Sequence, residues 1–377
     1  MRRLLAFITV LLIAASASVF AIGFGYHVIE ARADMDFGYG IFPLSLNYQF
    51  NFPVPDFIGG STTELAFRLD NGLDFRELRQ NPDDGSFYAE TGVDHTTSYM
   101  AIYDEFNLFF NQGFWNNHIT VGVSVDGRFE NAYEAITFMR DGNDEGLFWT
   151  ENGKSRFEGS SFIGAPELAG DRSVFQTYLS GLFQLDFMSD EVVRRSGVRF
   201  TSAFRITGPW APLNDGTANF LISENTLDLS HTLFSLQRGS GKNWMSFVLD
   251  NSTTYRYIHG DKVPFFAQGG QVWGDVYAPN TSHVITNSTS LTWYGPQLTL
   301  DTYPSVSVFY NIGWSLGKAL NSNSDETYSE TVVVYGIEAE IMLLDIAKFY
   351  WNWGFVTDPA FNETPRAIST IGFTFGV

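Results

Sequence analysis

The sequence predicts an all-β protein: a single closed antiparallel transmembrane β-barrel of 14 strands, with 16 strands as the alternative. Three observations support this prediction. Aromatic residues make up 16% of the chain and charged residues only 17%, below the roughly 25% of ordinary soluble domains. Apolar and polar residues alternate along much of the chain, as in strands with one apolar face. The alternation is clearest in the last eight residues, 370–377.

The first 21 residues have the layout of a secretory signal peptide. Arg2 and Arg3 precede the apolar run 4–14, and small residues follow it. We expect cleavage after Ala21, with cleavage after Ala17 as the alternative, so that the barrel occupies residues 22–377. After this segment no apolar run reaches the about 18 residues that a membrane helix needs. Export excludes cytoplasmic nucleotide chemistry, and no P-loop or dinucleotide fingerprint is present.

Alternating runs follow one another through the rest of the chain. Each has large apolar residues on one face and polar or small residues on the other, as a strand between lipid and a wet lumen requires. The C-terminal runs are about 11–13 residues long, close to the 9–11 residues with which a tilted strand spans a bilayer. The runs are 44–52, 67–76, 100–110, 119–126, 175–187, 198–206, 224–233, 245–250, 305–316, 333–343 and 348–355.

The segments between the runs predict two kinds of connection. Loops 317–330 and 356–366 are long, whereas the turn at Leu344-Asp345 is tight, which matches the long outer loops and short periplasmic turns of bacterial barrels. Residues 139–172 are polar and have no sustained period. We expect a long loop there that could fold into the lumen, because side chains alone do not fill a 14-strand barrel. Residues 262–300 could hold one, two or three strands.

Charged residues on the polar faces of the runs are the best candidates for a functional site. Charges of both signs can pair across strands and fill a closed lumen, or form rings that set the ion selectivity of a pore. The predicted lumen charges are Arg68, Asp70, Asp74, Arg76, Asp186, Arg199, Arg205, Asp228, Asp250, Arg256, Glu338, Glu340 and Lys348. The net charge of −20 disfavours a nucleic-acid partner, which needs a basic face. If the acidic excess lines a pore, it favours cations.

The C-terminal strand carries a recognisable motif. Thr370, Gly372, Phe375 and Val377 resemble the C-terminal β-signal by which bacterial outer-membrane β-barrels are recognised for insertion. The resemblance implies a location in the bacterial outer membrane, contact with its lipid, and binding of the last strand to the barrel-assembly machinery. Phe375 and Val377 would face lipid where this strand closes the barrel against the first.

The chain as a whole resembles the porin-like class of outer-membrane barrels. This resemblance implies passive diffusion or facilitated uptake of a small solute, whose identity stays open. The long-chain fatty-acid transporter family is similar in size, strand number and aromatic content. However, the Asn-Pro-Ala motif of that family's N-terminal hatch is not found near Ile22, which puts a hydrophobic substrate in doubt.

We expect no enzymatic activity, no metal and no cofactor. The chain has no cysteine, which excludes disulfides, thiol catalysis and Cys-zinc sites. Its six histidines are scattered without metal-ligand spacing, and no G-x-S-x-G motif is present. Four Asn-x-Ser/Thr segments, including Asn251-Ser252-Thr253 and Asn287-Ser288-Thr289, match the glycosylation pattern, which arises by chance in polar β-chains.

Two other functions remain open beside an outer-membrane channel. One is a non-conducting structural or adhesive barrel whose outer loops contact a partner. The other is a secreted soluble β-sandwich that binds a ligand. A sandwich would bury one face of each strand in a shared core and have frequent tight hairpins.

Overall fold

The computed structural model describes most of the chain after the predicted signal peptide. The signal peptide and the predicted inward loop 139–172 lie outside the described residues. The residues that the structure describes are 26–36, 44–78, 97–134, 173–189, 191–211, 219–239, 242–261, 263, 270–273, 276–278, 281–298, 302–320, 327–344, 346–357 and 365–376.

The described residues form sixteen strands and one short 3-10 helix, η2 (Val192–Arg194). The strands are β1 (Tyr26–Asp36), β2 (Leu44–Phe52), β3 (Thr63–Leu78), β4 (Thr97–Phe114), β5 (Ile119–Glu134), β6 (Ser173–Asp186), β7 (Gly197–Thr207), β8 (Asn219–Gln237), β9 (Asn243–Asp261), β10 (Gly270–Trp273), β11 (Val276–Ala278), β12 (Thr281–Tyr294), β13 (Tyr303–Ala319), β14 (Thr327–Leu343), β15 (Ala347–Thr357) and β16 (Arg366–Gly376).

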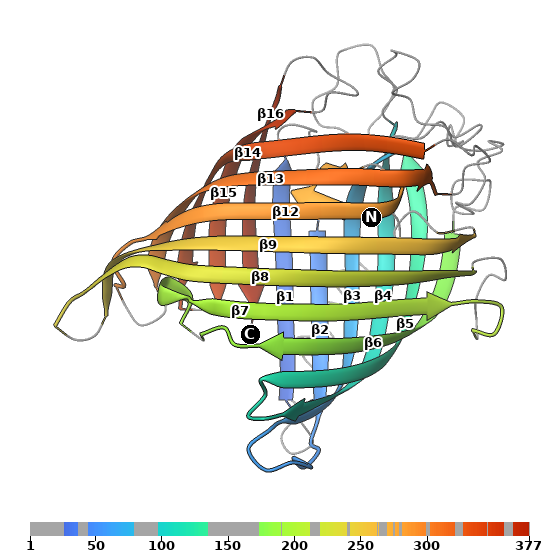
Figure 1. The fold of residues 1–377 in the computed structure, drawn as a ribbon, viewed down its shortest axis with the longest axis horizontal. Helices are drawn as coiled ribbons and strands as arrows, with labels where there is room; N and C mark the ends of the chain where they lie inside the picture. Colours follow the sequence, from blue (N-terminus) through green and yellow to red (C-terminus); the bar gives the residue numbers. More distant parts are fainter. Residues whose placement is uncertain are drawn as a thin grey trace, which may run out of the picture.

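Fourteen of these strands form a closed antiparallel barrel, which confirms the predicted fold class and strand number. Each strand pairs with its neighbour in sequence, except that β9 pairs directly with β12. β16 pairs with β1, and Phe375 lies opposite Ala31, so the last strand closes the barrel against the first as predicted. A single closed sheet excludes the alternative β-sandwich. In Figure 1 the near strands cross the far ones steeply, as tilted barrel strands do.

The outer face of the barrel is apolar, as the alternation predicts. On β13 the side chains of Val306, Val308 and Tyr310 are exposed, whereas Ser305 and Ser307, which alternate with them, are buried on the inner face. Large apolar side chains on the outside and small polar ones inside invert the arrangement of a soluble protein. This inversion is stable only where lipid covers the outer face.

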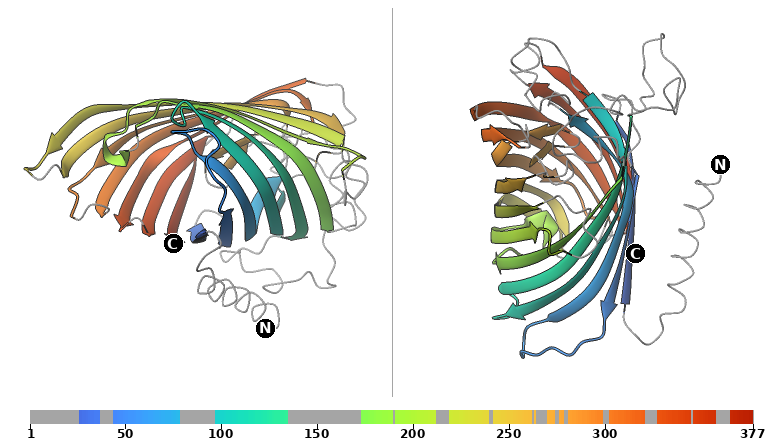
Figure 2. Two further views of the ribbon diagram at one scale, coloured as in Figure 1. Left: turned by 90° about the horizontal axis from the view of Figure 1, so that it is seen from below. Right: turned by 90° about the vertical axis from the view of Figure 1, so that its right-hand side faces the viewer.

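The two ends of the barrel differ in the length of their connections. At the end where β16 finishes, which we call the short-turn end, the connections are 53–62, 115–118, 187–196, 238–242, 295–302 and 344–346. At the opposite, long-loop end they are 37–43, 79–96, 135–172, 208–218, 262–280, 320–326 and 358–365. The β8–β9 hairpin, with 19 residues in each strand, projects past its neighbours at the short-turn end (Figure 2).

The tight connections depend on residues that tolerate a left-handed backbone. Trp115, Asn116 and Asn117 between β4 and β5 all have positive φ angles, a conformation in which Asn is several-fold enriched. The Asn117 side-chain oxygen also accepts a hydrogen bond of 2.8 Å from the backbone N–H of Thr62. This bond ties the turn to the neighbouring connection 53–62.

One strand of the barrel escaped the sequence analysis. β12 shows no continuous apolar stripe, because Asn287 and Thr289 stand at outward positions between Ile285 and Leu291. Asn251 and Thr253 interrupt the outward apolar stripe of β9 in the same way, so the alternation does not show the full length of this strand. The segment 262–300, left open between one and three strands, holds the hairpin β10–β11 and β12.

None of the helices in the described part of the chain is long and apolar enough to cross a membrane. The short helix η2 lies in connection 187–196, on the lumen side of β8 and β9 at the short-turn end. There the backbone carbonyl of Val193 accepts a hydrogen bond from Ser246, and that of Arg195 accepts one from Thr232 at 2.9 Å. η2 therefore covers part of the lumen at this end.

Candidate functional site

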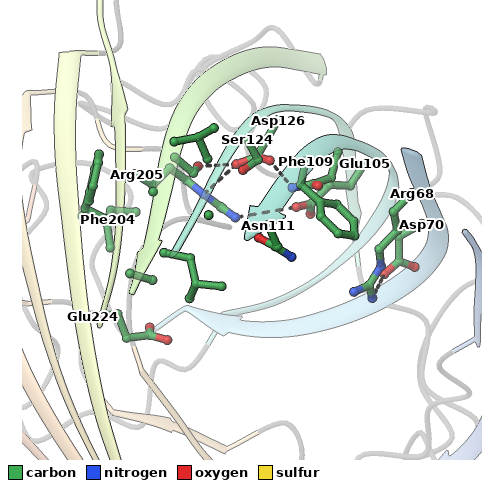
Figure 3. Close-up of a pocket in the computed structure, with 18 of the residues that line it drawn as sticks. Arg68, Asp70, Glu105, Phe109, Asn111, Ser124, Asp126, Phe204, Arg205 and Glu224 are labelled. Carbon is green, nitrogen blue, oxygen red and sulfur yellow. Dashed lines mark hydrogen bonds and ion pairs between the residues drawn. The ribbon is translucent and has the colours of Figure 1, made fainter. Parts of the chain in front are cut away.

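A cavity of about 630 Å³ lies in the barrel lumen against the inner faces of β3 to β9. Charged side chains from six of these strands line it. Figure 3 shows Asn111 and Ser124 among the uncharged residues of its lining. Alternation along each strand places these side chains inside, because the residues before and after each of them point to the outer face of the barrel.

Ion pairs link several of these charges into one chain across β4, β5 and β7. Glu105 lies between two guanidinium groups, at 3.1 Å from Arg128 and 3.8 Å from Arg205. Arg128 also pairs with Glu130 at 2.7 Å, and Arg205 with Asp126 at 3.8 Å. Within this chain of ion pairs, the side chains of Glu130 and Asp126 are almost fully buried, whereas those of Glu105 and Arg205 are open to the cavity.

Hydrogen bonds and aromatic rings hold this chain in place. Asp126 accepts hydrogen bonds from Ser180 and Asn107 on the two adjacent strands. The Arg128 guanidinium lies 4.2 Å from the centre of the Tyr103 ring, and Arg205 lies 5.0 Å from that of Tyr178. A cation over a ring face is attracted by the electron-rich face of the ring's quadrupole. The charged tips are therefore fixed in position along the cavity wall.

Two further ion pairs flank the chain on either side. Arg68 lies 3.5 Å from Asp70 on β3, and Arg256 of β9 lies 3.7 Å from Glu224 of β8. All four line the cavity, so charges of both signs run along the inner face from β3 to β9. We call this surface the charged arc.

The other predicted lumen charges lie apart from the cavity. Arg199 pairs with Asp186 at 2.9 Å, and Lys348 pairs with Glu340 at 2.8 Å. Asp228 accepts a hydrogen bond of 2.7 Å from Ser252. Asp250 and Glu338 occupy lumen-facing positions of β9 and β14, and the side chains of Asp74 and Arg76 lie outside the described residues.

The sequence analysis missed the centre of the site. It did not select Glu105, Asp126, Arg128, Glu130 or Glu224, although each occupies the polar face of an alternating strand. Counting positions from the apolar residues of the same runs would have found them. Asp104, also on β4, points outward and accepts a hydrogen bond from Asn71.

Part of the inner wall opposite the charged arc, towards the long-loop end, is apolar and covered. The hairpin β10–β11 folds into the lumen from the long-loop end and lies behind β12 and β13 in Figure 1. Its Val272 and Trp273 pack on an apolar patch that we call the apolar arc. The Trp273 ring stacks on Phe309 with centroids 4.9 Å apart. The apolar arc consists of Val284, Phe309, Val332, Val334, Val356 and Ile368.

Glycines make room for this packing. A Cβ at Gly336 would lie 2.9 Å from the Phe309 ring and 2.2 Å from the Trp353 backbone oxygen. A Cβ at Gly270, the first residue of β10, would lie 2.7 Å from Val284. The hairpin and the Phe309 ring therefore approach the wall more closely than any residue with a side chain would allow.

A second apolar cluster lies at the long-loop end of the charged arc. Phe220, Ile222 and Ile258 of β8 and β9 are buried there with Tyr178. Val263, just after β9, packs on this cluster. The segment that leaves β9 therefore contacts the inner wall before it forms the inward hairpin.

No group of three or more His, Cys, Asp or Glu side chains that could hold a metal ion occurs in the part of the chain that the structure describes. Of the four residues of the C-terminal motif, the structure describes Thr370, Gly372 and Phe375. Phe375 points outward, as expected for a lipid-facing residue, and its ring stacks with that of Phe373 at 6.5 Å. Val377 lies outside the described residues.

No family model matches the sequence, and no curated protein matches it. Among solved structures, CdiB from Escherichia coli has a TM-score of 0.52 and 10% identity, over 93% of this chain and 63% of that chain. BamA from Haemophilus ducreyi lacking POTRA domains 1–3 has a TM-score of 0.49 and 10% identity, over 93% and 70%. An outer membrane channel from Pseudomonas putida F1 has a TM-score of 0.34 and 8% identity, over 95% and 97%.

These similarities concern the fold. The match to CdiB from Escherichia coli and the closed strand order show the fold of bacterial outer-membrane β-barrels, as the sequence predicted. It spans less than two thirds of the length of CdiB from Escherichia coli and from Acinetobacter baumannii, at 63% and 60% of those chains. With identities near 10%, the neighbours indicate the architecture, and the function has to be argued from the lumen.

Proposed function

We propose that this protein is a passive outer-membrane channel for small polar solutes, with the solute path along the charged arc. One observation carries the proposal: a cavity of about 630 Å³ lined by charged side chains remains in the lumen, opposite an inward hairpin. An apolar solute would gain little from this lining. Ions and small polar molecules can replace part of their hydration shell with carboxylate, guanidinium and amide groups.

Buried polar groups support a hydrated lumen. The side-chain amide of Gln176 is almost fully buried on the inner face of β6, and neither its oxygen nor its nitrogen bonds to a described protein group. Buried polar atoms in native proteins nearly always have a protein or water partner. Water behind the charged arc would satisfy this amide and would also hydrate a passing solute.

The balance of charges on the inner face favours cations. More carboxylates than guanidinium or ammonium groups occupy lumen-facing positions among the described wall residues. The carboxylates are Glu30, Glu64, Asp70, Glu105, Asp126, Glu130, Asp186, Glu224, Asp228, Asp250, Glu330, Glu338 and Glu340, and the cations are Arg32, Arg68, Arg128, Arg199, Arg205, Arg256 and Lys348. Because many of these charged groups form ion pairs with one another, we propose that the channel is only weakly selective for cations.

The hairpin β10–β11 narrows this path and leaves the charged arc open. In the strand order of the barrel, β13 and β14 lie directly across the lumen from β4 and β5. Trp273 and Val272 therefore cover the wall opposite Glu105 and Asp126. A solute would pass between the hairpin and the charged arc. The hairpin would limit the size of the solutes that pass, and the charged arc would select among them by their charge.

A non-conducting structural or adhesive barrel is the second candidate. It is favoured by the two inward-packed segments, the hairpin and Val263, together with η2 at the short-turn end. If these segments meet the charged arc in the membrane, the lumen is closed. The charges of the arc would then act as a stabilising network and would not line a path.

The proposed location is the bacterial outer membrane, with the long-loop end outside the cell. The apolar outer face would contact lipid, and β16, with Thr370, Gly372 and Phe375, would bind the barrel-assembly machinery. Cell fractionation combined with heat-modifiable migration on gels tests this location. Recovery of the mature chain in buffer without detergent would contradict it. The signal peptide and its cleavage after Ala21 or Ala17 stay predictions.

Single-channel recording in planar bilayers tests the channel. Folded protein, identified by heat-modifiable migration, should produce discrete conductance steps with a small preference for cations in a salt gradient. Folded and inserted protein that carries no current would contradict the channel and favour the structural barrel.

A further inference from the structure

Four uncharged polar side chains form a cluster on the outer face of the barrel, where the neighbouring side chains are apolar. They are Asn251 and Thr253 of β9 and Asn287 and Thr289 of β12, and we call them the polar quartet. The two Asn-Ser-Thr segments pair antiparallel, with Asn251 opposite Thr289 and Thr253 opposite Asn287. Alternation places both Asn and both Thr on one face, the face of Leu249 and Leu291.

The side chains beside the polar quartet on the two neighbouring strands are three aliphatic residues and Tyr310, which lies beside Thr289. Leu227 and Leu229 of β8 lie beside Thr253 and Asn251, and both are exposed on the outer face. On the β13 side, Ile312 lies beside Asn287. The quartet is therefore a polar island within the lipid-facing belt.

The island lies near the middle of the bilayer. Along β12, Thr289 is four residues from Trp293 towards the short-turn end, and Asn287 is four residues from His283 towards the long-loop end. Four residues of a tilted strand rise about 10 Å along the barrel axis. The apolar band of such barrels is about 25 Å tall with aromatic residues at both borders. Water and lipid headgroups do not reach this depth.

Hydrogen bonds connect the four side chains but do not use their full capacity. The Asn287 amide donates to Thr253 at 2.7 Å and to Asn251 at 3.3 Å, and the Asn251 amide donates to Thr289 at 2.8 Å. The Thr289 hydroxyl donates to the Asn287 oxygen at 3.2 Å. The Thr253 hydroxyl donates to the Asn251 oxygen at 3.4 Å, so this oxygen accepts two hydrogen bonds. Each amide or hydroxyl oxygen can accept two, and the oxygens of Asn287, Thr253 and Thr289 each accept one within the quartet. In a bilayer the acceptor capacity that remains would meet lipid tails, which have nothing to donate.

We infer that the outer face of β9 and β12 is a self-association interface, through which two copies of this chain meet in the membrane. The inference rests on the proposed membrane location and is independent of solute transport. Copies inserted in the same direction are related by a two-fold axis along the membrane normal, which brings the same patch of each copy face to face.

A second copy is the occupant that fits the chemistry of the polar quartet. Amides and hydroxyls donate and accept hydrogen bonds, so two identical quartets complement each other. The quartet has no charge that would select a charged partner. Between polar side chains within a bilayer, hydrogen bonds across an interface stabilise association because lipid offers no alternative partner. The surrounding Leu227, Leu229 and Ile312 would then pack against their counterparts.

Counting subunits in liposomes tests the interface. Single-molecule photobleaching of labelled protein should give mainly two-step traces for the natural chain. The double substitution Asn251→Leu and Asn287→Leu should give mainly one-step traces, while heat-modifiable migration shows that the barrel still folds. Asn225→Leu is the matched control, because Asn225 faces outward on β8 beyond the quartet, and it should keep two-step traces. One-step traces for the natural chain, or two-step traces for the double variant, would overturn the interface.

Cross-linking provides a second test, in which three of the four side chains of the polar quartet stay unchanged. Because the chain has no cysteine, a single Thr289→Cys substitution places one thiol per copy at the proposed two-fold contact. Oxidation in membranes should convert most of the protein to a disulfide-linked dimer. Ile337→Cys, on the outer face of β14, should stay monomeric. Equal cross-linking at the two positions, or none at Thr289→Cys, would contradict the inference.

Discussion

The charged arc and the apolar arc are two parts of one inner wall that differ in chemistry and in what covers them. Ion pairs such as Glu105–Arg205 remain open to a cavity, whereas Val334 and Phe309 lie beneath the hairpin. Covering charges with an apolar segment would cost their hydration. Covering apolar side chains that would otherwise face water is favourable by about 25 cal/mol for each Å² buried.

This difference explains how a wide barrel can restrict its lumen with a short segment. Side chains alone do not fill a barrel of this size. The hairpin covers the wall that gains from being covered and leaves the charged wall hydrated. In the proposed channel, the chemistry of the wall therefore determines where the solute path runs. Three predictions test this, in order of decreasing effect on conductance.

Removal of the hairpin should have the largest effect. Replacing residues 270–278 with a short Gly-Ser linker uncovers the apolar arc and widens the lumen, so single-channel conductance should rise several-fold. Ile337→Ala is the control, because this side chain is exposed on the outer face of β14, away from the lumen, and its conductance should match the natural chain. Unchanged conductance after removal of the hairpin would show that the path does not run past it.

Single charge substitutions in the charged arc should change selectivity with a smaller effect on conductance. Glu105→Gln leaves Arg128 and Arg205 without the carboxylate between them, so relative anion permeability should rise roughly two- to three-fold. Arg205→Gln should shift the reversal potential in the opposite direction, and Arg205→Lys should leave it near the natural value. Reversal potentials in a KCl gradient measure the effect, and shifts of the same sign would contradict the charge assignment.

A change beneath the apolar arc should affect stability and leave selectivity unchanged. Gly336→Ala brings a methyl group against Phe309 and the backbone oxygen of Trp353. Overpacking of this kind typically destabilises by about 1–3 kcal/mol, which urea titration of the folded band on gels should detect. Gly239→Ala, at a position where a Cβ meets nothing within 4 Å, is the matched control. A selectivity shift in Gly336→Ala would mean that the two arcs are coupled.

The sequence was sufficient to predict the closed barrel, its 14 strands and the closing pair β1–β16. Lipid outside and water inside impose a two-residue period on almost every strand, and this period is visible without a structure. Where the outer face departs from it, prediction failed. Asn287 and Thr289 concealed β12, and β10 and β11 are too short, at four and three residues, to show a period.

The candidate site was predictable in composition but not in its contacts. Alternation assigns Glu105 and Arg205 to the lumen, but nothing in the sequence brings β4 near β7. Their contact depends on the register of the intervening strands, in which Asp126 of β5 and Ser180 of β6 lie between them. The inward hairpin was equally hidden, because the apolar arc on which it packs comes from five strands.

Thiol modification during single-channel recording tests most directly whether the path runs along the charged arc. The chain contains no native cysteine, so single substitutions report without background. In Ser124→Cys, at the cavity wall, a charged methanethiosulfonate reagent should reduce the current in one abrupt step. In Val334→Cys, fully buried under the hairpin, the current should stay unchanged. Block at Val334→Cys with no effect at Ser124→Cys would contradict the account.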